Sequence, residues 1–60
     1  MEKTLKETLD EMLFSMLGDE ELMDIWWHSP NKAFENKVPN FVYEIDPQKV
    51  LSYVTFHYNR

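Results

Sequence analysis

The sequence contains no cysteine and only one glycine, Gly18. Without cysteine, the chain has no disulfide, no catalytic thiolate and no cysteine-ligated zinc. With one glycine it cannot build a glycine-rich loop around a phosphate in the usual way. No apolar run reaches the length of a signal peptide or a membrane span. We therefore expect a cytoplasmic protein without a membrane partner.

Basic residues are also scarce, with six Lys and Arg against eleven Asp and Glu and a formal net charge of −5. Residues 1 to 24 carry eight of the acids, against Lys3 and Lys6. Binding to a phosphate backbone needs clustered Lys and Arg, so we expect no nucleic-acid partner. The acidic half is either a solvated helix face or a surface that docks onto a basic protein.

The composition is nevertheless that of a folded protein, because 43% of the 60 residues are hydrophobic and 15% are aromatic. We expect residues 1 to 60 to form one domain. A chain this short buries only about 60% of its unfolded surface and is marginally stable alone. That leaves a role for a partner protein or a homodimer.

The first predicted helix begins at Thr4, where Thr4 and Glu7 match a capping box, and it ends at Gly18 as C-cap. Its apolar stripe, at steps of three, four and one, is Leu5, Leu9, Met12, Leu13, Met16 and Leu17. Phe14 lies off this stripe. Phe14 is therefore either a residue that faces a partner or the edge of a wide apolar face.

A second helix is predicted from Asp19, as N-cap, to about His28. Its apolar residues occupy almost two faces, more than one packed face requires: Leu22, Met23, Ile25, Trp26 and Trp27. Adjacent helical residues point about 100° apart, and a small domain has little interior for two indoles. Either both tryptophans lie in the core, or one of them anchors an interface, where Trp is enriched.

Prolines divide the region after the tryptophans into short segments. Pro30 should end the second helix, with Ser29 as N-cap and Pro30 as first residue of a helical turn that runs through Phe34. Asn36 suits a left-handed residue, and Pro39 opens another short helix. The expected inward side chains of this corner are Trp26, Ala33 and Phe34.

The last helix is predicted from Pro47, capped by Asp46, to about His57. Its expected inward residues are Val50, Leu51, Val54 and either His57 or Tyr58. Residues 50 to 58 also favour a strand, but no comparable second strand is present to pair with it. The predicted fold is all-α: a small single-domain bundle of three main helices with one or two short connecting helical turns.

Residues 26 to 39 resemble the core of the Xre/MbcA/ParS toxin-binding domain, the C-terminal module of antitoxins that pair with RES-type toxins. The resemblance rests on a structural motif that has this spacing, namely Trp26, Trp27, Pro30, Asn31, Ala33, Phe34, Asn36 and Pro39. It extends over about residues 10 to 58. The chain differs from the family at Asn36, where Gly is usual, and at Val38, where a capping Thr is common.

The resemblance implies a helical module that binds a protein and inhibits it, with all NAD chemistry in the partner toxin. In the family, the surface around the last helix approaches the toxin. The corresponding residues are Tyr53, His57, Tyr58, Asn59 and Arg60. Trp26 corresponds to the core Trp of the motif, whereas Trp27 replaces a leucine. We therefore predict Trp27 and Phe14 as further partner-binding residues and Trp26 as a core residue.

No motif indicates an enzyme, a metal site or a cofactor. His28 and His57 lack the spacing of a metal-binding motif, and Ser29 beside His28 is more simply a helix cap. We expect His28 to contact the carbonyls that end the second helix. Two alternative functions remain: a stand-alone phage-type inhibitor of a host or defence protein, which the lack of a preceding helix-turn-helix domain favours, and a homo-oligomeric structural protein.

Overall fold

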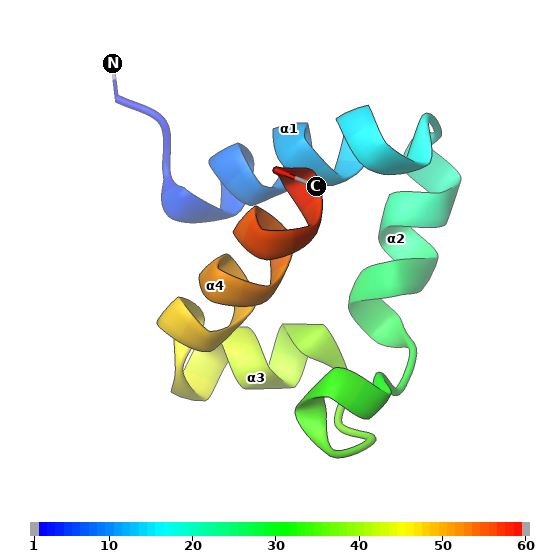
Figure 1. The fold of residues 1–60 in the computed structure, drawn as a ribbon, viewed down its shortest axis with the longest axis vertical. Coiled ribbons are helices and arrows are strands. Elements are labelled where there is room, and N and C mark those ends of the chain that lie inside the picture. The colour runs from blue at the N-terminus through cyan, green and yellow to red at the C-terminus, as the bar shows by residue number, and fades with distance from the viewer. Residues whose placement is uncertain (1, 60) are drawn as a thin grey trace.

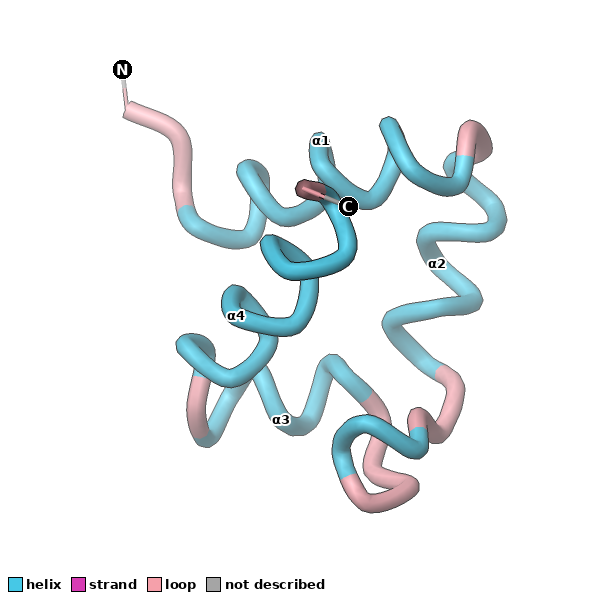
Figure 2. The backbone as a smooth tube through the Cα atoms, viewed as in Figure 1, coloured by secondary structure: helices cyan, strands magenta, loops and turns pink. Residues whose placement is uncertain are grey.

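The structure is a computed structural model that describes residues 2–59, and it has the predicted all-α fold. Its elements are α1 (Leu5–Leu17), α2 (Glu20–His28), the 3₁₀ helix η1 (Lys32–Phe34), α3 (Pro39–Ile45) and α4 (Pro47–Tyr58). Within the described part of the chain no residue belongs to a strand (Figure 2). The strand alternative for residues 50 to 58 was therefore wrong, and α4 occupies that segment.

The helices form a closed ring in chain order. Extensive contacts join α1 to α2, α2 to α3, α3 to α4, and α4 back to α1. Figure 1 shows this arrangement, with α1 along the top, α2 on the right, α3 at the bottom and α4 crossing the left side of the view. Because α2 and α4 lie on opposite sides of the ring, side chains must fill the space between them.

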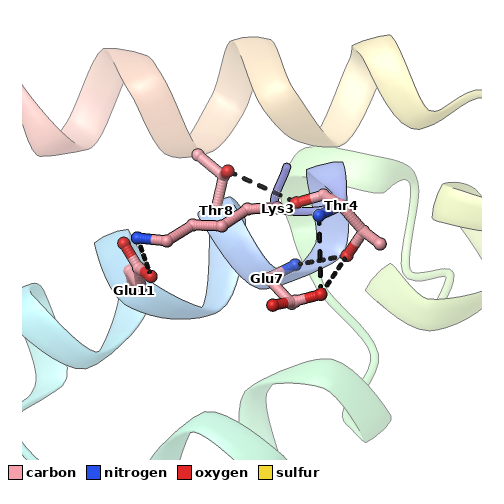
Figure 3. Close-up of polar contacts among 5 residues, drawn as sticks. All are labelled: Lys3, Thr4, Glu7, Thr8 and Glu11. Carbon is pink, nitrogen blue, oxygen red and sulfur yellow. Dashed lines mark hydrogen bonds and ion pairs between the residues drawn. The ribbon is translucent and has the colours of Figure 1, made fainter. Parts of the chain in front are cut away.

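The boundaries of α1 follow the predicted caps. Thr4 Oγ1 accepts a hydrogen bond from the Glu7 amide at 3.1 Å, and the Glu7 carboxylate accepts one from the Thr4 amide at 3.5 Å (Figure 3). Gly18 ends the helix with φ 77°, and its amide donates to the Phe14 carbonyl at 2.7 Å. Asp19 then caps α2 by accepting a hydrogen bond from the Glu21 amide at 2.7 Å.

One buried cluster joins all five elements. Its members are Leu9 and Leu13 of α1, Trp27 of α2, Phe34 of η1, Val42 of α3, and Val50 and Val54 of α4. Leu5, Met12, Met23, Trp26, Tyr43, Leu51 and Tyr53 are partly buried against it. Met16 and Leu17, predicted for the same stripe as Leu9 and Leu13, are instead exposed. The last turn of α1 extends beyond the edge of the core.

The corner between α2 and α3 is built differently from the prediction at three positions. Ser29 is the C-cap of α2, and it starts no helix because the next one, η1, begins only at Lys32. Asn31 is the N-cap of η1, since its side chain accepts a hydrogen bond from the Ala33 amide at 2.9 Å. Ala33 is exposed rather than inward. Pro30 therefore lies between the two helices and not in the first turn of η1.

The turn after η1 contains two left-handed residues in succession. Asn36, with φ 66°, was predicted to take this conformation, and Glu35, with φ 58°, was not. The Lys37 amide donates to the Phe34 carbonyl at 3.1 Å, and the Asn31 amide donates to the Lys37 carbonyl at 3.1 Å. These hydrogen bonds close the corner, and Pro39 then begins α3 as predicted.

Candidate protein-binding surface

Trp27 is a core residue, and its prediction as an exposed anchor was wrong. Its exposed fraction is 4%. The indole Nε1–H donates a hydrogen bond of 2.7 Å to the carboxylate of Asp10 on α1. The Lys6 ammonium lies 4.5 Å from the centroid of the indole ring. Trp27 therefore offers almost no surface to a partner, although its side chain forms part of the lining of a hollow beside Lys6 and Asp10.

Trp26 lies at the edge of the core, between α2 and α4. Its ring meets the Trp27 ring edge-on at 5.1 Å between centroids, and it stacks on Tyr53 at 6.1 Å. Tyr53 in turn meets Phe34 at 5.2 Å. The space between α2 and α4 is therefore bridged by aromatic rings. Trp26, which was predicted as a core residue, is half-buried. Trp27, which was predicted to face a partner, is the more deeply buried of the two.

The aromatic contacts continue along α4. The Tyr53 and His57 ring centroids are 4.4 Å apart, and those of His57 and Phe56 are 5.3 Å apart. We call Trp26, Tyr53, His57 and Phe56 the aromatic row. Two predicted partner-binding residues, Tyr53 and His57, thus lie together, and Tyr53 is half-buried whereas His57 is exposed.

The other predicted binding residues are not part of this row. Tyr58 is exposed at the end of α4, and Phe14 is exposed on α1. Arg60 lies outside the described residues. His57 and Tyr58 were also considered as inward residues of the last helix. Both are exposed, because Val50 and Val54 already fill the buried side of α4.

A second apolar face of α2 is open to solvent. Leu22 and Ile25, three residues apart on the helix, are 46% and 52% exposed. With Leu17, Trp26 and Pro30 they line a shallow hollow of 260 Å³. We call these five residues the outer α2 surface. The predicted surplus of apolar residues on this helix is real, but Leu22 and Ile25, not a tryptophan, are its exposed members.

The opposite side of α2 forms a groove with α1. We call its lining residues the α1–α2 groove: Asp10, Glu11 and Phe14 of α1, and Glu20 and Met23 of α2. This hollow measures 330 Å³. Asp10, Glu20 and Met23 also line a neighbouring hollow of 460 Å³, which reaches Lys6 and Asp24. The carboxylates of Asp10, Glu11, Glu20 and Asp24 therefore line these two hollows.

The two histidines lie on different elements. His28 Nδ1 is 2.9 Å from the Asp24 carbonyl oxygen, the predicted contact with the end of α2, and 3.5 Å from the Asp24 carboxylate. His57 belongs to the aromatic row. Among residues 2–59, no three His, Asp or Glu side chains gather in a way that would hold a metal ion.

Comparisons of this chain with protein-family models, with curated proteins and with solved structures found no match. No helix within residues 2–59 has both the length and the apolar character needed to cross a bilayer.

Proposed function

We propose that this chain is a non-enzymatic domain that binds a partner protein and inhibits it, in the manner of an antitoxin. The observation that carries the proposal is the outer α2 surface. Its side chains line a hollow together with Ser29 and Asn31, while the other side of the same helix already contributes Trp27 to the core. Contiguous exposed apolar residues on a small protein are typical of a protein interface.

Leu22 and Ile25 are the residues from which a partner would gain most binding energy. Burying a Leu or Ile side chain fully contributes about 1.5 to 3 kcal/mol, and roughly half of each is still exposed here. A partner that covers both residues and fills the hollow gains about half of this energy at each residue, without unfolding the domain. Trp26, which connects the outer α2 surface to the aromatic row, extends the same interface towards Tyr53 and His57.

The first partner to test is a RES-type toxin that consumes NAD. This class follows from the resemblance of residues 26 to 39 to the Xre/MbcA/ParS domain. Three motif residues fit a structural role in such a module: Phe34 is buried, Asn31 caps η1 and Pro39 begins α3. The NAD chemistry belongs to the toxin, so the chain itself needs no cofactor.

The test is binding of the chain to a purified RES-type toxin by calorimetry, together with NAD consumption by the toxin. The double substitution Leu22→Gln and Ile25→Gln should weaken binding at least about 10-fold, because the apolar area that the partner covers on two side chains is lost. The matched control is Phe41→Gln with Ile45→Gln, which changes an exposed apolar pair on α3. The proposal would be contradicted if the two double variants weakened binding equally, or if the wild-type chain neither bound the toxin nor reduced its NAD consumption.

A second candidate is a stand-alone inhibitor of another protein, such as a host or defence protein of the kind that phages block. The acidic α1–α2 groove supports it, since a carboxylate-lined surface suits a basic partner. Binding to such a protein without binding to any RES-type toxin would favour this candidate. The outer α2 surface would be tested in the same way.

A further inference from the structure

The α1–α2 groove combines an apolar floor with an acidic border. Phe14, 47% exposed, and the half-buried Met23 supply the apolar part. Asp10, Glu11 and Glu20 supply three carboxylates around them. The side chains of Lys and Arg have matching properties, because their aliphatic stems pack on apolar surface while their charged ends seek carboxylates.

The three carboxylates differ in whether they already have a hydrogen-bond or ion-pair partner within the chain. One oxygen of Asp10 accepts the hydrogen bond from Trp27, at 2.7 Å. Glu11 forms an ion pair with Lys3 at 2.5 Å, but both side chains are more than half exposed, so solvent screens the pair (Figure 3). No ion pair reaches Glu20 within residues 2–59. The groove thus retains negative charge that its own lysines do not neutralise.

Lys6 of the chain itself already places a cation over aromatic rings in an adjacent hollow. It lines the neighbouring hollow together with Asp10 and Asp24. Its ammonium lies 4.5 Å from the centroid of the Trp27 ring and 5.9 Å from that of Tyr43. A lysine cation over an aromatic ring, in a hollow that carboxylates also line, is the arrangement that an incoming basic side chain would repeat beside Phe14 and Glu20.

We infer that the α1–α2 groove receives a basic amphipathic helix of the partner protein, whose apolar residues cover Phe14 and Met23 and whose Lys or Arg side chains reach Glu11 and Glu20. This inference rests on the proposed protein-binding function and adds the chemistry of the partner. Charge complementarity selects this occupant. A second copy of the chain, itself at net charge −5, and a nucleic acid would both bring like charge to the groove.

The probe is a synthetic amphipathic helical peptide of about 18 residues, with leucines along one face and arginines beside them. The control peptide has glutamate in place of every arginine. Binding to the intact chain is measured by calorimetry, and amide shifts are mapped by NMR. We expect a Kd on the order of 10 μM for the basic peptide and none measurable for the control. The shifts should be largest at Phe14, Glu20 and Met23.

Two double variants of equal net charge separate the groove from general acidity. Glu11→Gln with Glu20→Gln should weaken binding of the basic peptide at least about fivefold. Glu35→Gln with Glu44→Gln removes two exposed acids outside the groove and should change the affinity less than about twofold, as an effect of overall charge alone. Equal losses in the two variants, or shifts confined to the outer α2 surface, would overturn the inference.

The two proposals can fail independently. If a toxin or other partner loses affinity with Leu22→Gln and Ile25→Gln but not with Glu11→Gln and Glu20→Gln, the binding function stands and the groove inference is wrong. If the basic peptide binds in the groove while Leu22→Gln with Ile25→Gln leaves the affinity for the partner unchanged, the groove inference is correct and the proposed interface on the outer α2 surface is wrong.

Discussion

At the scale of single residues, Trp27 joins more parts of the molecule than any sequence pattern indicated. Its ring meets Trp26 at 5.1 Å and Tyr43 at 5.8 Å, its Nε1–H is bonded to Asp10, and Lys6 covers one face. One side chain therefore connects α1, α2 and α3. Removing it leaves a cavity and also leaves the Asp10 carboxylate without its donor.

We predict that Trp27→Ala lowers the free energy of unfolding by about 3 to 5 kcal/mol, enough to unfold most of a domain this small. Trp26→Ala should cost less, because Trp26 is only partly buried and loses chiefly its contacts with Tyr53 and Phe34. Urea denaturation followed by circular dichroism measures both. Trp27→Phe, which keeps most of the apolar volume, serves as a milder variant that stays folded. A larger loss for Trp26→Ala than for Trp27→Ala would contradict this ranking.

At the scale of elements, the turn between η1 and α3 places a glutamate where the backbone is left-handed. A residue with a Cβ pays roughly 1 to 2 kcal/mol in this conformation, and asparagine tolerates it better than glutamate does. Asn36 therefore suits its position, whereas Glu35 is held there by the hydrogen bonds that close the corner.

Glu35→Gly should raise the free energy of unfolding by about 0.5 to 1 kcal/mol, since the relief of strain exceeds the entropy that glycine adds to the unfolded chain. Glu44→Gly, inside α3, should lower it by about 1 kcal/mol. Both substitutions remove one exposed acid, so each controls for the charge of the other. Urea midpoints give the comparison, and a decrease for Glu35→Gly would show that strain at this residue is negligible.

Local chemistry explains which elements could be predicted from the sequence. Thr4, Gly18, Asp19 and Pro47 act through their nearest neighbours, and the helix ends they mark were correct. The face that each helix buries depends on distant elements. Trp27 is buried through contacts with other helices, among them Asp10 of α1 and Tyr43 of α3. No periodicity within α2 distinguishes it from Trp26. The exposed pair Leu22 and Ile25 was signalled only by the excess of apolar residues on this helix.

At the scale of the whole molecule, apolar and acidic surfaces lie on opposite sides of one helix. The outer α2 surface is apolar, and the α1–α2 groove carries carboxylates. Self-association through the outer α2 surface would bring two chains of net charge −5 together. Binding of a basic partner in the groove would instead reduce the net charge.

These two associations should therefore respond to salt in opposite directions. Between about 0.05 and 0.5 M salt, any homodimer should become stronger, because repulsion between the chains is screened. Binding of a basic partner should become weaker over the same range. Sedimentation equilibrium measures the first response and calorimetry the second. A dimer that dissociates at high salt would mean that its interface uses ion pairs, not the outer α2 surface.

The ring of helices also bears on how fast the chain folds. Three of its four extensive helix contacts join α-helices that follow one another along the chain, so they form between residues close in sequence. The contact of α4 with α1 joins the last helix to the first (Figure 1). Chains dominated by local contacts fold within microseconds to milliseconds, and long loops are slowest to close. The transition state should thus contain the α1–α2 and α3–α4 pairs, with the docking of α4 on α1 as the last event before the native state.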